Sequence, residues 1–463
     1  MKKFLLVFLA LVIAMTSIVF ASCNQTPAGP SDDKNQGNGD GDQNGNDLDA
    51  TPTPVRDENN LFIWWDQGAA DVSLLQDAWY DFSDLYAGKV GPSGKQFSKE
   101  INMFHMDGDE NGTTMLEQQV MAGTAPDVVR MDHVYITALG QKGLVFDLQE
   151  KWQATDKISD QFIASTWEAS SSFDRVYGIP FDANTIIFGA RTSILEQAGV
   201  SMPTTYDELR TVGAKIKALN LDQNVYTLPC GTDARYNWPA FVFMFWVWRL
   251  GGDVLNEDMT QAIFNDTETG VEALNMMLQL QEDGLISATA YEEGNTVMCD
   301  YGTWWMNGLQ EDMTLSLQLK LKDDVPQYSG LGLYDLAIVT TAKNPELAYD
   351  FAVHFATGKN SVSGDHYVYT FCKAHNLIPS CIEAAETGGD YTTETKNEFW
   401  RLSVEQLELS KYRPPVACWP EIEEAISTAV TQAIQGEKAP KEALNAAAAL
   451  ANQLLEEEAK TRK

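Results

Sequence analysis

The segment from Tyr177 to Leu209 constrains the fold more than any other part of the chain. An apolar strand is predicted from Thr185 to Gly189, because its β-branched and aromatic residues favour extended backbone. A helix is predicted from Ser193 to Ala198, ended by Gly199, and a second helix follows a Pro-Thr-Thr sequence with acidic residues in its first turn. The segment therefore indicates a protein in which strands and helices alternate.

The four residues from Phe181 to Asn184 lie between two extended pieces of this segment. Asp182 and Asn184 bring a carboxylate and an amide close together at a junction between strands. Such a pair is typical either of a turn or of a ligand site. The local residues leave both alternatives open.

Length and charge restrict the classes of protein and partner. A chain of 463 residues with 44% hydrophobic content is too long for one ordinary domain, so we expect two lobes. The formal net charge of −34 opposes binding to nucleic acid or anionic lipid and suits a neutral or cationic ligand. Six cysteines are too few for a disulfide scaffold, although Cys372 and Cys381 are close enough in sequence to pair.

The N-terminus has the layout of a bacterial lipoprotein signal. Two lysines precede an apolar run from Phe4 to Phe20, and small residues then lead to Cys23. This predicts a signal peptide over residues 1–22 and lipidation of Cys23. The alternative is an uncleaved anchor helix, since the run is about at the lower length limit for a membrane span.

Residues 24–58 contain almost no apolar side chains, so we expect residues 23–58 to form a disordered tether. A flexible segment of about 35 residues reaches roughly 30–35 Å root-mean-square. With a lipid on Cys23, it would hold a folded domain near the extracytoplasmic face of the cell membrane.

Strand and helix patterns alternate through the rest of the chain, which predicts an α/β fold. The expected strands include Leu61–Trp65, Ile101–Phe104, Tyr226–Cys230 and Leu331–Thr341. The expected helices include Val72–Tyr86, Met115–Met121, Phe241–Leu250, Val271–Leu280, Pro345–Phe355, Ile422–Gln435 and Ala443–Leu455. Ligands of open α/β sheets bind outside the carboxyl ends of the strands, so polar residues at those positions are candidate site residues.

Several motifs occur in an order and spacing that resemble one family. They are Gly123–Val129 (GTAPDVV), Tyr177–Pro180 (YGIP), Ala198–Leu209 (AGVSMPTTYDEL), Gly294–Trp305 (GNTVMCDYGTWW) and the helix from Pro345. Together they resemble the family 1 extracellular solute-binding proteins, which are the sugar-binding subunits of bacterial ABC importers. The resemblance covers nearly the whole chain after the tether.

The resemblance implies a two-lobed periplasmic-binding-protein-like fold of type II, with a flanked sheet in each lobe and a hinge at a central cleft. The first lobe would comprise residues 59–180 and 333–375, and the second residues 181–332 and 376–463. It implies a monomeric binding protein rather than an enzyme, without a cofactor. Ligand would favour the closed state, which then docks on a membrane permease.

Strand-end position and the resemblance together predict the ligand-binding residues. They are Trp65, Asp66, Asp132, Asp182, Asn184, Asp233, Arg235, Trp238, Trp304, Trp305, Tyr334, Asp335 and Trp419. Carboxylates are strong acceptors for sugar hydroxyls, and indole rings pack against the apolar faces of sugar rings. We therefore expect a carbohydrate ligand, and an oligosaccharide in particular.

Three alternatives remain open. The same fold could bind a peptide, a polyamine or a metal complex, and Arg235 would favour an anionic sugar. A secreted glycoside hydrolase would need two facing carboxylates, for which Asp66 and Asp182 are candidates. The loop that begins at Asp107 resembles a calcium loop, but Gln118 replaces its final glutamate, and a helix-capping loop explains it equally well. No metal site is therefore predicted.

Overall fold

The computed structural model describes residues 54–65, 69–108, 112–153, 158–227, 238–286, 295–308, 311–387 and 392–461. The chain from Pro54 onward forms one compact unit by its internal contacts. The strands are β1 (Asn60–Trp65), β2 (Asn102–Asp107), β3 (Val128–Asp132), β4 (Ser171–Ser172), β5 (Arg175–Val176), β6 (Ile179–Asn184), β7 (Ile186–Arg191), β8 (Asn224–Thr227), β9 (Thr296–Gly302), β10 (Met313–Ser316), β11 (Ser329–Ile338), β12 (Ile378–Pro379) and β13 (Ser410–Tyr412).

The helices cover the same described residues. They are α2 (Ala69–Tyr86), α3 (Thr113–Ala122), α4 (His133–Gln141), α5 (Leu148–Trp152), η1 (Ser159–Gln161), α7 (Ala164–Ala169), α8 (Thr192–Ala198), α9 (Tyr206–Lys217), α10 (Trp238–Arg249), α11 (Gly270–Glu282), η3 (Thr303–Gly308), α12 (Pro345–Thr357), α13 (Tyr367–His375), α14 (Ile382–Glu386), α15 (Glu394–Leu407), α16 (Trp419–Ile434) and α17 (Pro440–Thr461).

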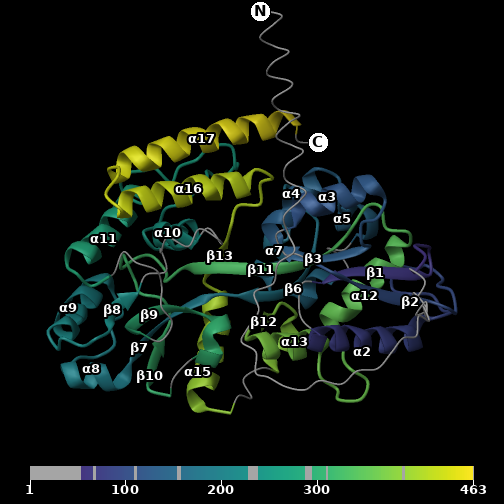
Figure 1. Ribbon diagram of the computed structural model, residues 1–463, viewed down its shortest axis with the longest axis horizontal. Coiled ribbons are helices and arrows are strands. Elements are labelled where there is room, and N and C mark those ends of the chain that lie inside the picture. Colours follow the sequence, from purple (N-terminus) through teal and green to yellow (C-terminus); the bar gives the residue numbers. More distant parts are fainter. Residues whose placement is uncertain are drawn as a thin grey trace, which may run out of the picture. The chain divides into compact units, whose positions relative to one another are not determined.

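The first sheet has the strand order β12-β6-β11-β3-β1-β2, and β13 pairs with β11 (Figure 1). β1 is parallel to β2 and β3, whereas β11 runs antiparallel to β3 and to β6. Helix α12 contacts α2, α13, β6 and β11, and buried residues of these elements form one hydrophobic core with β1. Residues Leu61–Trp65 are all buried, as their apolar composition predicts for a central strand.

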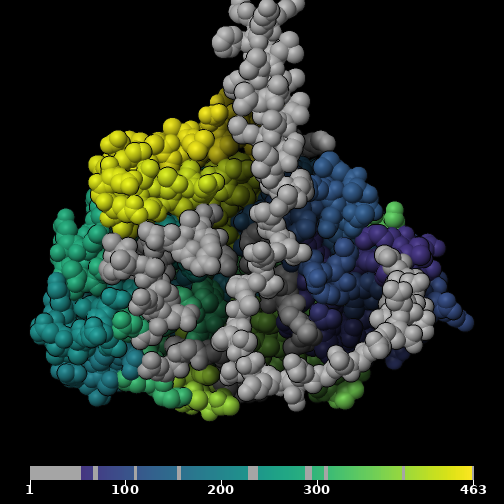
Figure 2. All heavy atoms as spheres, in the orientation of Figure 1, coloured from purple at the N-terminus to yellow at the C-terminus, as the bar shows by residue number. Residues whose placement is uncertain are grey.

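The second sheet has the order β10-β7-β9-β8 and a separate core. Helix α10 is apolar on every side, and each of its residues from Pro239 to Arg249 is buried. It packs against α11 and α16, and α16 packs along α17, which Figure 2 shows in yellow above the teal segments of this half. The buried helix predicted over Phe241–Leu250 is confirmed.

Two stretches of chain join the sheets. β6 belongs to the first sheet and β7 to the second, and only Thr185 lies between them. β11 pairs with β6 and β3, and it also contacts α10 of the second half (Figure 1). Phe181–Asn184 therefore lie within β6, so the turn alternative for these residues is wrong. Pairing with β11 satisfies their backbone in an extended conformation.

The predicted end of the helix from Ser193 to Ala198 is confirmed. Gly199 ends α8 at a φ of 65°, in the left-handed region that favours glycine. Thr205 caps α9 by accepting a hydrogen bond from the Glu208 N–H. Cys372 and Cys381 are both buried and both free. β12 pairs with β6 in the first sheet, beyond the boundary at residue 375 expected for that lobe.

Some predictions fall outside the described residues, namely those for Cys23, Asp66, Asp233 and Arg235. The candidate calcium loop is also only partly described, because residues 109–111 lie outside these ranges. Among the described helices, none combines the length and the apolar character that crossing a membrane requires.

Candidate functional site

Polar side chains gather where three strands of the first sheet approach the half of the molecule that contains the second sheet and helices α10, α11, α16 and α17. Tyr334 of β11 pairs across the sheet with Asp132 of β3 on one side and with Asp182 of β6 on the other. Paired residues of neighbouring strands project on the same face, so these side chains form one row across the sheet. Arg130 precedes Asp132 by two residues and therefore shares that face.

Asp132 ends β3 and begins α4. Its carboxylate caps the helix by accepting a hydrogen bond of 3.1 Å from the Val134 N–H. Both of its oxygens also accept hydrogen bonds from Nη2 of Arg413, at 2.7 and 2.6 Å. Burial opposes ionisation of Asp132, but the guanidinium outweighs it and holds the pKa of this carboxyl well below its usual range.

Arg413 lies between β13 and α16 and connects the two halves. Its Nη1 is 3.7 Å from Oε1 of Glu423 in α16, and its guanidinium carbon is 6.0 Å from the ring centroid of Phe241 in α10. Burial disfavours its charge, but the facing carboxyl groups raise the pKa of Arg413 above its ordinary value. Arg413 therefore stays a cation between β3 and the helices of the second half.

Asp182 is held in an ion pair inside the first sheet. Nε and Nη2 of Arg130 donate to its two carboxylate oxygens at 2.9 and 3.0 Å, and the Asp182 side chain is fully buried. The Arg130 guanidinium also lies 4.2 Å from the ring centroid of Tyr334. This pair fixes the orientation of the half-buried Tyr334 ring rather than presenting Asp182 to a ligand.

Asp335, on β11, is a second buried carboxyl group of the first sheet. Ser170 Oγ donates to its Oδ1 at 2.8 Å, and the side chain has no exposed surface. Burial raises the pKa of Asp335 well above its usual value, and the charges of Asp132 and Asp182 act in the same direction. Gly178 packs against it so closely that a Cβ at this position would lie 2.5 Å from Asp335 Cβ. Asp335 thus belongs to the interior of the sheet.

A row of aromatic rings lies in the second half. The ring centroids of Trp238 and Trp304 are 5.5 Å apart, those of Trp304 and Trp305 are also 5.5 Å apart, and Tyr301 lies 6.1 Å from Trp305. All four rings are half-buried. Gly302 makes the arrangement possible, because a Cβ there would lie 2.2 Å from the Trp304 ring.

Phe241 joins the aromatic row to the polar group. Its centroid is 5.8 Å from that of Trp238, and its ring also faces Arg413. We call the combined set the junction site. It consists of Asp132, Trp238, Phe241, Tyr301, Trp304, Trp305, Tyr334 and Arg413.

The structure brings together only some of the predicted ligand-binding residues. Asp132, Trp238, Trp304, Trp305 and Tyr334 belong to the junction site, and the half-buried Asn184 ends β6 opposite Gly332. In contrast, Trp65 and Trp419 are 1% and 0% exposed in the two cores, and Asp182 and Asp335 are 0% exposed. These four side chains have no surface with which to touch a ligand in this structure, and they pack or pair internally instead.

Three members of the junction site escaped the sequence predictions, namely Arg413, Phe241 and Tyr301. Phe241 lies in a uniformly apolar run, so nothing distinguishes it from its core neighbours. Arg413 does carry a signal, because it is the only charged residue in the otherwise apolar stretch Arg413–Pro420. A charge in such a stretch indicates a buried partner.

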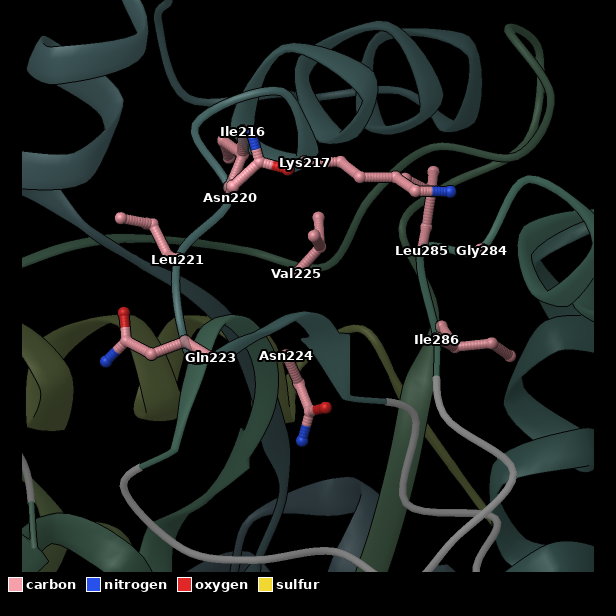
Figure 3. Close-up of a pocket in the computed structure, with 10 residues that line it drawn as sticks. All are labelled: Ile216, Lys217, Asn220, Leu221, Gln223, Asn224, Val225, Gly284, Leu285 and Ile286. Atoms are coloured by element: carbon pink, nitrogen blue, oxygen red, sulfur yellow. The ribbon is translucent and has the colours of Figure 1, made fainter.

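A separate cavity of about 290 Å³ lies at the end of α9, beside β8 and the segment after α11 (Figure 3). Its lining combines apolar side chains with Lys217 and the amides of Asn220, Gln223 and Asn224. It contains neither an aromatic ring nor a carboxylate. The junction site therefore offers more varied recognition chemistry. Within the described part of the chain, no group of three His, Cys, Asp or Glu side chains could hold a metal ion.

Comparisons with known proteins agree with this architecture. Residues 105–360 match the sequence model of the family described as bacterial extracellular solute-binding protein. A galactooligosaccharide-binding protein of Bacillus subtilis (strain 168) is 22% identical over 415 residues, which cover 84% of this chain and 88% of that protein.

Solved structures give the same result for the fold. A cyclic α-maltosyl-1,6-maltose binding protein from Arthrobacter globiformis has a TM-score of 0.67 at 21% identity, covering 87% of this chain and 99% of its own. A solute binding protein of an ABC transporter from Thermotoga lettingae TMO, bound with α-D-tagatose, has a TM-score of 0.66 at 20% identity, covering 86% of this chain and 100% of its own. The fold is thus that of the type II periplasmic sugar-binding proteins.

Proposed function

The chain belongs to the bacterial extracellular solute-binding protein family, and from this premise we propose that it captures an extracellular carbohydrate for an ABC importer. Because the family consists of solute-binding proteins, this chain is a binding protein and not an enzyme. The observation that carries the proposal is the row of half-buried aromatic rings beside the paired Asp132 and Arg413 at the junction of the two sheets.

This combination suits a sugar because a sugar ring has two kinds of surface. Its C–H faces are apolar and pack flat against indole rings, which Trp238, Trp304 and Trp305 supply. Its hydroxyl groups need fixed donors and acceptors, which the charged groups of the junction site supply. Several contacting rings offer more apolar length than one sugar ring covers, which favours an oligosaccharide. The names of two similar proteins, which bind a galactooligosaccharide and a cyclic maltosyl-maltose, support this choice.

The proposed mechanism is hinge closure. A ligand that touches residues of both halves stabilises the conformation in which the halves are closest. The hinge segments would be the β6–β7 connection and β11, which join the sheets. The lobes would follow the expected boundaries, with residues 59–180 and 333–375 in the first and residues 181–332 and 376–463 in the second, except that β12 (Ile378–Pro379) joins the first sheet. The closed protein would deliver its ligand to a membrane permease.

The proposal also includes the N-terminal region. A signal peptide over residues 1–22, a lipid on Cys23 and a tether to residue 58 would keep the protein on the extracytoplasmic face of the cell membrane. The protein would act there as a monomer without a cofactor. The lipid would be its only attachment to the membrane.

A binder of a different solute on the same fold is the second candidate function. A peptide or a polyamine would also use carboxylates and aromatic rings. The glycoside hydrolase alternative loses support from the structure, because Arg130 pairs with both oxygens of Asp182 and leaves this candidate carboxylate fully buried.

A thermal-shift screen of the full-length chain in detergent tests the proposal, with mono- and oligosaccharides, amino acids, peptides and calcium as ligands. A sugar at about 100 times its dissociation constant should add roughly 2.7 kcal/mol to the free energy of unfolding. Small-angle scattering should then show a smaller radius of gyration with the sugar. Stabilisation by a peptide or calcium, with none by any sugar, would instead support the second candidate.

The variant Trp304→Ala should weaken binding of that sugar roughly tenfold or more, because about 1.4 kcal/mol of stacking corresponds to a factor of ten. Isothermal titration calorimetry measures the change. Tyr80→Ala is the matched control, since Tyr80 is an aromatic residue of α2 with 65% exposure outside the junction site. Equal affinities of wild type and Trp304→Ala would remove the aromatic row from the binding site.

A further inference from the structure

Arg413 occupies a position that links the parts of the junction site. It contacts Asp132 of the first sheet, approaches Glu423 of α16 and faces the ring of Phe241, which in turn touches Trp238 of the aromatic row. Tyr334 pairs across the sheet with Asp132, the partner of Arg413, and so lies near the guanidinium as well. A ligand lying between Tyr334 and the aromatic row therefore passes close to Arg413.

The orientation of the guanidinium is fixed from one side. Nη2 is committed to both oxygens of Asp132, and Nη1 points toward Glu423. The side chains of Arg413, Asp132 and Glu423 are only 11%, 15% and 5% exposed, so water screens these interactions weakly. Such a rigid arrangement presents the remaining donor of the guanidinium without further ordering.

Nε is that remaining donor. It is buried and has no hydrogen-bond partner among the residues that the structure describes. A buried donor without an acceptor costs about 1–3 kcal/mol, and such groups are rare in folded proteins. Because Nε has almost no accessible surface here, a ligand oxygen reaches it only through the hinge movement proposed above. An oxygen that then accepts from Nε would remove this cost in the bound state.

The local charge determines which oxygen is preferred. Asp132 neutralises the guanidinium through two hydrogen bonds, and the carboxyl group of Glu423 lies on its other side. The group as a whole therefore carries no excess positive charge, and the chain has a formal net charge of −34. An anionic ligand would meet repulsion here, whereas a neutral hydroxyl or ring oxygen can accept from Nε.

We propose that Arg413 is a specificity-determining residue, which donates a hydrogen bond from Nε to an oxygen of a neutral carbohydrate. Asp132 is the positioning residue that orients the Arg413 guanidinium. The negative charge of Asp132 also disfavours binding of acidic sugars. This inference rests on the proposed function. It differs from the expectation that Asp132 itself binds the ligand, and from the alternative of an anionic sugar.

Isothermal titration of the full-length chain in detergent with galactobiose, maltose and digalacturonate tests the inference. Wild type should bind one of the neutral disaccharides at least tenfold more tightly than digalacturonate. Arg413→Lys keeps the charge but removes Nε, and should weaken binding of that neutral disaccharide roughly tenfold. Asp132→Asn keeps an acceptor for the cap of α4. It should reduce the ratio between the dissociation constants for digalacturonate and for the neutral disaccharide roughly tenfold. The double variant should bind the neutral sugar no more weakly than Arg413→Lys alone, because Asp132 acts through Arg413.

The outcomes separate this inference from the proposed function. Unchanged affinity in Arg413→Lys, or digalacturonate binding as tightly as the neutral disaccharides, overturns the role of Arg413. The proposed function still stands in that case if Trp304→Ala weakens the same sugar. Absence of binding by every carbohydrate in the screen overturns both. Melting temperatures of all variants identify any loss of folding, and Glu423→Gln provides a second route to altered charge selectivity if Asp132→Asn does not fold.

Discussion

At the scale of residues, the pair of Arg130 and Asp182 shows how strongly this protein depends on a buried charge. Arg130→Ala leaves the Asp182 carboxylate buried without its partner, and should lower the free energy of unfolding by about 3–5 kcal/mol. Arg401→Ala is the matched control, because Arg401 forms an exposed i,i+4 pair with Glu405 worth about 0.3–0.5 kcal/mol. Urea denaturation measures both values, and similar losses in the two variants would contradict a structural role for the buried pair.

Asp335 should make stability depend on pH. Its folded pKa is raised above the unfolded value of about 3.9, because it is buried beside Asp132 and Asp182. The folded state therefore holds a proton that the unfolded chain loses, and wild-type stability falls as pH rises above about 4, by up to about 1.4 kcal/mol per pH unit until the folded pKa is passed. Asp335→Asn keeps an acceptor for Ser170 but has no ionisable carboxyl group, so it lacks this loss of stability with rising pH.

The variant should consequently gain stability over wild type as pH increases. Chemical denaturation at pH 4 and at pH 7 measures the difference in the free energy of unfolding between the variant and wild type. Asp300 also has a raised pKa, but it is present in both proteins, so its contribution cancels in this difference. A difference that is the same at both pH values would mean that the folded pKa of Asp335 is not raised.

At the scale of elements, the helices begin and end where local chemistry favours it. Thr205 accepts a hydrogen bond of 3.3 Å from the Glu208 N–H and so caps α9. Thr205→Ala should cost about 1 kcal/mol, because it leaves a first-turn N–H without its acceptor. Thr211→Ala in the same helix should be neutral or slightly stabilising, since alanine has the higher helix propensity. Chemical denaturation compares the two, and an equal effect would exclude a capping role for Thr205.

The elements that join the two sheets limit how the halves of the molecule can move. β6 ends and β7 begins with one residue between them, yet the two strands belong to different sheets. Such a short connection can change direction but cannot lengthen, so the hinge movement proposed above would be a rotation about Thr185 and β11. The residues of the junction site lie around these elements and come from both halves, so such a rotation would change how the two sets of residues face each other.

At the scale of the whole molecule, we propose that a lipid at the N-terminus determines where the protein acts. A lipid on Cys23 should place wild type in the membrane fraction, resistant to high-salt washing, because acyl chains rather than charges hold it there. Cys23→Ser should release the protein to the extracytoplasmic soluble fraction. Fractionation followed by immunodetection measures the distribution. If Cys23→Ser remains in the membrane, the apolar run from Phe4 to Phe20 is an uncleaved anchor.

The sequence by itself determined most elements and their order. Strand propensity, helical periodicity and capping residues act over a few neighbours, so the strand at Leu61–Trp65, the buried helix α10 and the end of α8 at Gly199 follow from local chemistry. Strand-end position, together with the resemblance to the solute-binding proteins, also predicted five members of the junction site.

Only the tertiary structure decided which of those strand-end residues remain accessible. Four predicted residues share their residue types with members of the junction site, yet packing buries them against partners distant in sequence. They are Trp65, Trp419, Asp182 and Asp335. Arg413 gained its place in the site through Asp132, which lies 281 residues earlier. Whether a carboxylate or an indole faces a ligand or a neighbouring side chain depends on these long-range contacts, and no local pattern of residues contains them.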